Sequence, residues 1–292
     1  MSMRRVAPAT ALFFISPLVA EFLLGDFTLA QLPFLVLLAP AYGGAAVLVR
    51  EIARRTGRGW PTMLLLALAY GVIEEGLETQ SLFNPHYLGL DLLAPAFVPA
   101  LGISVSWTLF VLAIHTIWSI STPIALVEEW TTRRTTPWLR LPGLIAAAVL
   151  ITVAFLVPAT RAADASGKAA PAAWVVGIVA LTVGVVLMLV DPLPAYAGVV
   201  IVPAAFATTI TVVWRWSNRP GWDGRHRLAL AGGALLTYVW HSFTMNPVVP
   251  ASAALRVGSH VVFALVAVVL LVLEARRVRA RETRPEMAAA VA

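Results

Sequence analysis

Long apolar stretches alternate with short polar connections along almost the whole chain. A helix needs about 20 apolar residues to cross a hydrocarbon layer roughly 30 Å thick. Stretches of about that length lie near residues 8–25, 32–49, 60–82, 103–127, 141–159, 172–190, 194–214, 228–248 and 254–274. The pattern therefore predicts an all-α fold, a polytopic transmembrane helix bundle with eight or nine spans.

Prolines separate two of these stretches, and a polar tail follows the last one. Pro192 and Pro194 interrupt an apolar run from 172 to 214, because each removes a backbone donor and clashes with the preceding turn. No polar segment is long enough to bury a core outside the bilayer. We expect residues 1–277 to form a single transmembrane helical domain and residues 278–292 to form a disordered charged tail.

Composition excludes a soluble protein. Hydrophobic residues make up 60% of the chain and charged residues 12%, with a mean hydropathy of +0.85, whereas soluble domains average about 45–50% and about 25%. The net charge is +6, but the arginines form short clusters beside apolar stretches, which predicts membrane lipid and not nucleic acid as the partner. The chain has no cysteine, which excludes disulfides, thiolate metal sites and cysteine nucleophiles. We expect a multi-pass protein of the prokaryotic cell membrane.

Five arginine clusters predict the topology. They lie within residues 4–5, 50–58, 133–140, 215–227 and 276–284, and the positive-inside rule places all five in the cytoplasm. Three apolar stretches lie between Arg140 and Arg215, where an even number of crossings is required. The number of crossings in that region stays open.

The third stretch carries acids that a bilayer tolerates poorly. Glu74, Glu75 and Glu78 fall within five positions, and α-helical spacing stacks Glu74 with Glu78. One acid near the bilayer centre costs roughly 2.5–3.5 kcal/mol, so three acids need partners or protons. This pattern predicts a functional site. Glu21 and Asp26 lie at the outer end of the first stretch, where placement at the membrane interface explains them.

Two histidines lie at the same predicted depth as these acids. His115 lies near the middle of the fourth stretch, and His241 lies about 20 Å along the eighth, followed by Asn246. His260 is nearer the outer surface and is expected to contact an outer loop. We predict one site in the outer-to-central half of the bilayer. Its candidate catalytic residues are Glu74, Glu75, His115, His241 and Asn246.

The order of these residues resembles the membrane-embedded CAAX-protease and bacteriocin-processing (CPBP) family, whose motifs are Glu-Glu-x-x-x-Arg, Phe-x-x-x-His and His-x-x-x-Asn. Glu74 and Glu75 match the acidic pair, His115 the first histidine and His241 the second. Thr79 replaces the arginine, and Phe110 and Asn246 are each displaced by one residue. The resemblance implies an intramembrane protease. A closer resemblance, in residues 74–77, 81–85 and 115–128, is to uncharacterised polytopic prokaryotic membrane proteins and implies no reaction.

Two function classes use the same residues, and from the sequence we expect an intramembrane hydrolase, with a transporter as the alternative. In an intramembrane hydrolase acting on a peptide or lipid, a carboxylate with a histidine activates water, while His241 and Asn246 hold the oxyanion. In a proton- or cation-coupled transporter, the acids bind the coupling ion. A metal held by two histidines and a glutamate, or haem b between His115 and His241, stays open. The cofactor is therefore unknown from the sequence.

Overall fold

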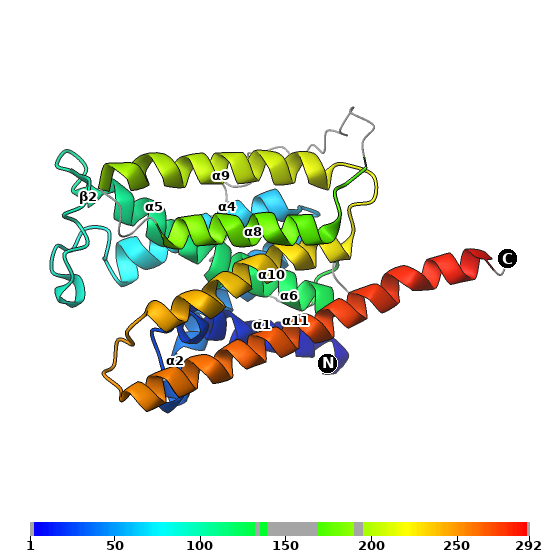
Figure 1. The fold of residues 1–292 in the computed structure, drawn as a ribbon, viewed down its shortest axis with the longest axis horizontal. Helices are drawn as coiled ribbons and strands as arrows, with labels where there is room; N and C mark the ends of the chain where they lie inside the picture. The colour runs from blue at the N-terminus through cyan, green and yellow to red at the C-terminus, as the bar shows by residue number, and fades with distance from the viewer. Residues whose placement is uncertain (1–2, 132–134, 139–168, 190–194, 291–292) are drawn as a thin grey trace.

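The structure is a computed structural model that describes residues 3–131, 135–138, 169–189 and 195–290. Helices dominate it, and several of them run side by side (Figure 1). Two short strands, β1 (Phe97–Val98) and β2 (Ile103–Ser104), pair antiparallel with Phe97 opposite Ser104 and Val98 opposite Ile103. They lie in the loop that precedes α5. An all-α membrane protein is thus confirmed for the described part of the chain.

The α-helices are mostly apolar, and their charged residues lie mainly near their ends. They are α1 (Met3–Pro17), α2 (Leu35–Leu38), α3 (Gly44–Arg55), α4 (Trp60–Ile73), α5 (Val105–Ile114), α6 (Thr122–Trp130), α8 (Ala173–Met188), α9 (Ala195–Ser217), α10 (Gly224–His241) and α11 (Ala253–Ala290). Short 3₁₀ turns form at η2 (Leu29–Phe34), η5 (Tyr87–Gly89) and η8 (Ser242–Thr244).

Among the residues that the structure describes, four continuous helical segments are long and apolar enough to cross a membrane. They are Leu29–Arg55, Val105–Trp130, Ala197–Ser217 and Ala253–Arg281. Two further apolar helices, Ala7–Leu23 and Ala173–Met188, are shorter. The total of eight or nine spans stays a prediction, and the predicted stretch 141–159 lies outside the described residues.

Two helix ends differ from the sequence predictions. The stretch 228–248 does not form one helix, because α10 ends at His241 and the backbone is extended at Met245, just before Asn246 and Pro247. A residue that precedes proline is biased away from helical conformation, which explains the early end. At the other end of the chain, α11 continues to Ala290. Most of residues 278–292 thus belong to α11, consistent with their content of alanine, arginine and glutamate, and disorder of this tail stays a prediction.

In the described part of the chain, four π-helical segments continue directly from or into α-helices. They are η1 (Leu18–Leu23), η3 (Ala39–Gly43), η4 (Glu74–Glu78) and η6 (His115–Ser121). In a π turn each amide donates to the carbonyl five residues before it, as Thr79 does to Glu74 at 2.9 Å. Each segment contains a polar or aromatic residue of the site described below. Hydropathy and α-helical spacing do not predict these segments.

Ion pairs gather several helix ends at one side of the bundle. Arg54 of α3 and Arg227 of α10 bind Glu128 and Glu129 at the end of α6. Arg281 of α11 donates to the carbonyl of Trp130 at 3.0 Å. We call this side the arginine end, and the side with the loop of residues 79–104 the loop end; they lie to the right and left in Figure 1. Three of the predicted cytoplasmic clusters thus share one side, and its cytoplasmic placement stays a prediction.

The fourth predicted stretch, which forms α5, η6 and α6, lies between η4 and α10. His115 on η6 meets η4, while the ring of Trp118 stacks on Tyr238 of α10 with centroids 5.0 Å apart. On its far side α10 packs closely on α8, where a Cβ added to Gly233 would lie 2.6 Å from the carbonyl oxygen of Gly177. Small residues at such contacts let membrane helices approach closely.

Candidate functional site

Three buried titratable side chains meet near the loop end. His115 Nε2 lies 2.6 Å from Glu75 Oε1 and 2.9 Å from Glu74 Oε2. The exposed fractions are 5% for Glu74, 6% for Glu75 and 5% for His115. We call these residues the Glu–Glu–His centre. The prediction that an acid of the third stretch and His115 converge is confirmed.

The two glutamates are bonded differently. His115 Nε2 and Glu75 Oε1 are hydrogen-bonded, and the tautomer of the ring decides which of the two atoms carries the proton. Glu74 Oε2 lies 2.9 Å from the same nitrogen, but it has no directed hydrogen bond among the described residues. The centre therefore contains one carboxylate oxygen that is buried, near a nitrogen and incompletely satisfied.

Backbone geometry explains how the centre forms. An added Cβ on Gly71 would lie 3.1 Å from His115 Cβ, so glycine one turn before Glu75 allows α4 and η6 to approach. The predicted stacking of Glu74 with Glu78 is wrong, because Glu74 is buried and Glu78 is exposed. Both residues lie in the π turn η4, and they nevertheless have different environments.

A layer of hydroxyl groups holds the other polar atoms of the centre. Glu75 Oε2 accepts hydrogen bonds from Thr79 Oγ1 at 2.9 Å and from the Ser81 hydroxyl. The indole Nε1 of Trp107 donates to Ser81 Oγ at 3.0 Å. His115 Nδ1 lies 3.3 Å from Ser119 Oγ. These contacts orient Glu75 and the imidazole ring, and the sequence analysis did not find them because serine and threonine are common in apolar helices.

Two tyrosines pack against the imidazole. The ring of Tyr42 stacks on His115 with centroids 6.0 Å apart, and its hydroxyl donates to Glu21. Tyr70 meets His115 edge-on at 6.1 Å. The hydroxyl of Tyr70 is buried and has no hydrogen-bond partner in the described part of the chain. Placement at the membrane interface therefore does not fully explain Glu21, because Tyr42 links this residue to the centre.

Tyr87 brings the outer loop close to the acids. It lies in η5 and is partly buried. Burial and then the carboxylates of Glu75 and Glu74 raise the pKa of Tyr87 to about 12. The acids of the centre thus act electrostatically on a tyrosine of the loop end.

His241 and Asn246 have other partners. His241 ends α10, where its Nδ1 lies 3.4 Å from Thr244 Oγ1 and its ring meets Trp240 edge-on. Asn246 Oδ1 accepts from Arg256 at 2.8 Å. Among the described residues, the cluster with metal-ligand spacing contains Glu74, Glu75 and His115 and neither of these two. Equal depth along two helices does not bring side chains together when they face different neighbours.

His260 lies in a separate apolar environment. Its ring meets Phe243 edge-on at 5.6 Å, and an added Cβ on Gly25 would lie 3.2 Å from its Cε1. Both ring nitrogens are without hydrogen-bond partners in the described part of the protein. Phe243 belongs to the turn after α10, which is consistent with the expected contact to an outer loop.

The Glu–Glu–His centre has donor atoms suited to a proton or a metal ion. One ligand atom from each of the three residues lies within 4.8 Å of the others. Imidazole nitrogen and carboxylate oxygen are common ligands of zinc and other divalent transition metals. The same atoms accept and donate protons at neutral pH. The geometry is therefore compatible with ion binding and with acid–base chemistry.

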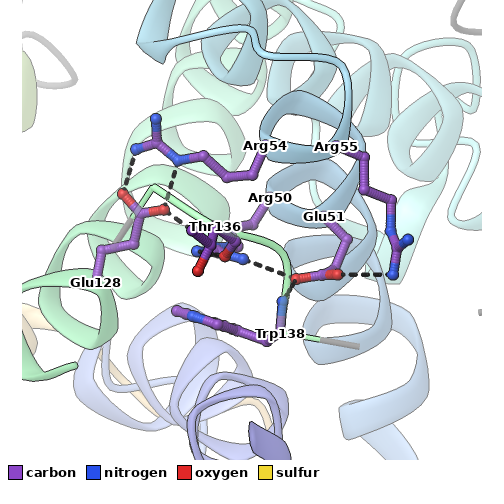
Figure 2. Close-up of polar contacts among 7 residues, drawn as sticks. All are labelled: Arg50, Glu51, Arg54, Arg55, Glu128, Thr136 and Trp138. Carbon is purple, nitrogen blue, oxygen red and sulfur yellow. Dashed lines mark hydrogen bonds and ion pairs between the residues drawn. The ribbon is translucent and has the colours of Figure 1, made fainter. Parts of the chain in front are cut away.

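A second buried charge cluster lies at the arginine end (Figure 2). Arg50 is fully buried, and its three nitrogens donate to Glu128 at 3.0 Å, to Glu51 at 2.7 Å and to the carbonyl of Thr136 at 2.9 Å. Its guanidinium carbon lies 3.6 Å from the ring centroid of Trp138. We call this cluster, with Arg54 and Arg55, the arginine network. The sequence analysis treated these arginines only as topology signals.

Comparisons with known proteins identify a family and no activity. Residues 11–292 match a family model described as an uncharacterised membrane protein family. No curated protein and no solved structure matches the chain. The resemblance to the CPBP family therefore has no support from these comparisons. Because the match covers nearly the whole sequence, the chain belongs to this uncharacterised membrane protein family.

Proposed function

We propose that the chain is a multi-pass proton- or cation-coupled transporter of the prokaryotic cell membrane, and that the Glu–Glu–His centre binds the coupling ion. The observation that carries this proposal is the contact of His115 Nε2 with oxygens of two buried glutamates. In this proposal the arginine end faces the cytoplasm, and the centre lies in the outer half of the bilayer.

Charge balance explains why such a centre exchanges protons. Two carboxylates and a neutral imidazole carry a charge of −2, which is costly in a low-dielectric interior. Protons shared among the three groups reduce that charge. Because carboxyl groups and imidazole are both titratable, a change in exposure of the centre to water changes its proton occupancy. Chains of such groups are typical of proton pathways in pumps and transporters.

The backbone around the centre favours a mobile site over a rigid scaffold. Glu21, Tyr42, Glu74, Glu75 and His115 all lie in π-helical segments. π turns are rare and occur frequently at functional sites. Helices with irregular backbone near the membrane midplane are also typical of ion sites in transporters.

An intramembrane hydrolase is the second candidate. The Glu75–His115 contact favours it, because a carboxylate paired with a histidine can act as a general base toward water. The candidate oxyanion donors His241 and Asn246 bind other residues. A hydrolase would therefore have a general base but lack the predicted groups that stabilise the oxyanion, so we place it second. Its substrate would be a peptide or a lipid.

The two candidates are separated in lipid vesicles that contain the purified chain and a fluorescent pH indicator. Pools of amino acids, organic cations and divalent metal ions are added outside, and the internal pH is recorded. We expect one pool to drive proton movement in the native protein and Glu75→Gln to abolish it. Glu78→Gln is the matched control, because Glu78 lies in the same helical segment but is exposed.

Absence of proton movement with every pool, together with cleavage of a fluorogenic peptide or lipid that is lost in Glu75→Gln, would favour the hydrolase. Topology is tested with single cysteines in this cysteine-free chain. Cysteines at Arg54, Arg225 and Arg276 are expected to resist an impermeant thiol reagent applied to intact cells. Labelling at any of them would contradict the cytoplasmic placement of the arginine end.

A further inference from the structure

We propose that the Glu–Glu–His centre binds a divalent transition-metal ion and that this ion is the cargo exchanged for protons. The inference rests on the proposed function, because it names the substrate class of the same centre. It excludes hard ions such as Mg²⁺ and Ca²⁺, which bind mainly to oxygen ligands.

The positions of the donor atoms fit one ion. Nε2 of His115 and one oxygen from each glutamate lie within 4.8 Å of one another. Zinc bonds of about 2.0–2.2 Å in tetrahedral geometry separate neighbouring ligand atoms by about 3.3 Å. The contacts of 2.6 and 2.9 Å between His115 Nε2 and the glutamate oxygens would lengthen by about 0.7 and about 0.4 Å to admit the ion. Side-chain rotation supplies a movement of this size.

The unsatisfied oxygen of Glu74 is an independent sign of a ligand. This side chain is only 5% exposed, and its Oε2 has no directed hydrogen bond among the described residues, although it lies 2.9 Å from His115 Nε2. Burial of an unpaired polar atom costs free energy, so such atoms need an explanation. A metal ion beside Nε2 would satisfy Glu74 Oε2 and Glu75 Oε1 together.

The second polar atoms of Glu75 and His115 already contact residues around the centre. Glu75 Oε2 is held by Thr79 and Ser81, and His115 Nδ1 lies beside Ser119. Metal sites in proteins use such outer contacts to fix the orientation of each ligand. Each of these two side chains thus offers one atom to the ion and one atom to the protein.

The charges of the three ligands favour a divalent ion and determine how many protons are exchanged for it. A divalent cation with two carboxylates and a neutral imidazole gives a net charge of zero. Two protons on the same three groups also give zero, whereas a monovalent cation alone leaves −1. Binding of one metal ion therefore releases two protons to the solvent, and the occupied centre stays neutral in either state, as a low-dielectric interior requires.

The test uses the full chain in detergent, without a histidine tag, after treatment with a chelator. Zn²⁺, Mn²⁺ or Mg²⁺ is added by equilibrium dialysis, bound metal is counted by mass spectrometry, and proton release is measured in weakly buffered solution near pH 7. We expect one Zn²⁺ or Mn²⁺ per chain, release of about two protons and no stoichiometric Mg²⁺. Glu74→Gln and His115→Ala are expected to weaken binding by more than about 100-fold, because each removes a direct ligand and loss of even an outer contact costs about 10–100-fold.

Glu78→Gln and His86→Ala, at exposed positions of the loop end, are the controls and should bind like the native chain. The proposal is overturned if native protein binds no ion stoichiometrically, if binding releases no protons, or if Glu74→Gln and His115→Ala bind as tightly as native protein. The native proton count decides the question even if a variant fails to fold.

Vesicle experiments separate this inference from the proposed function. Proton-coupled movement of another solute, lost in Glu75→Gln and without metal binding, would keep the transporter and reject the metal cargo. Stoichiometric metal binding, with no metal or other solute crossing the vesicle membrane under a pH gradient, would keep the metal site and reject both transport and the cargo role.

Discussion

The two buried charge clusters of this bundle differ in how completely their polar atoms are paired. In the arginine network, Glu128 accepts from Arg50 and Arg54, and Glu51 accepts from Arg50, Arg55 and the backbone of Trp138. In the Glu–Glu–His centre, Glu74 Oε2 is left without a directed bond. Both clusters are buried and charged, so burial alone does not distinguish them.

The side chains also differ in chemistry. Arginine keeps its proton at all physiological pH values and forms a rigid fork of donors. The network around Arg50 therefore has one stable protonation state and joins α3, α6 and the segment at Trp138 (Figure 2). The Glu–Glu–His centre contains only groups that gain and lose protons. This comparison favours a structural role for the first cluster and agrees with the exchange role that we propose for the second.

The largest expected effect tests the structural role of the arginine network. Glu128→Gln removes one charge from the network and leaves Arg50 buried with fewer partners, which should lower the free energy of unfolding by about 3 kcal/mol. Thermal unfolding in detergent measures it. Arg276→Ala, at an exposed position of α11, should change stability by less than about 0.5 kcal/mol. Equal stability of Glu128→Gln and native protein would break the comparison.

A smaller effect is expected where α4 meets His115. Gly71→Ala places a Cβ about 3 Å from His115 Cβ, and such overpacking should cost about 1–2 kcal/mol. Proton-coupled activity should fall as well, because the imidazole is displaced from the glutamates. Gly258→Ala is the matched control, since an added Cβ there meets no atom within 4 Å. A fully active Gly71→Ala protein would argue against a tightly positioned centre.

Replacement of a glutamate by glutamine is expected to affect stability less at the centre than at Glu128. Glu74→Gln removes one of two adjacent buried acids and keeps the shape of the side chain, so stability should change by less than about 1 kcal/mol. Proton-coupled flux should nevertheless be lost. Parallel measurement of unfolding and flux for the two variants sharpens the comparison. A loss of stability as large as that of Glu128→Gln would assign a structural role to both clusters.

The smallest effect concerns a charged group outside both clusters. Asp223 caps the start of α10; burial raises its pKa, but hydrogen bonds from Arg225 and His226 outweigh this effect and lower the pKa below its ordinary value. Its contribution to stability is present above the ordinary aspartate pKa and is lost as pH falls through the lowered folded pKa. We expect this contribution to stay below about 1 kcal/mol.

Thermal unfolding between neutral and acidic pH measures the contribution of Asp223. Asp223→Asn should remove the corresponding part of the pH dependence while keeping the helix cap, because asparagine caps helices as well as aspartate does. A pH dependence that is unchanged in Asp223→Asn would show that other carboxyl groups account for it.

Hydropathy was sufficient to predict the helical membrane fold and the core of the candidate site. Glu74, Glu75 and His115 stand out because a charged or ionisable residue in an apolar stretch is costly. Arg50 and Glu51 did not stand out, because arginine near a helix end is also a topology signal. Tyr42 gave no signal because tyrosine is common near membrane interfaces.

The direction in which a side chain points was harder to predict than its depth. His241 has the depth expected from its distance along α10, yet its neighbours are Trp240 and Thr244. Direction depends on helix rotation and on local backbone geometry. Glu74 and Glu78 show the same limit of periodicity, because α-helical spacing stacks them although Glu74 is buried and Glu78 is exposed.

The π-helical segments make this protein sensitive to single-residue insertions and deletions as well as to substitutions. Removing Gly76 from η4 would allow ordinary α-helical bonding to continue from α4, with little change in helix length. Thr79 and Ser81 would then turn away from Glu75, although every residue of the Glu–Glu–His centre would still be present. Relatives that keep these residues but lack one position within η4 would share the fold and lose the hydroxyl partners that orient Glu75.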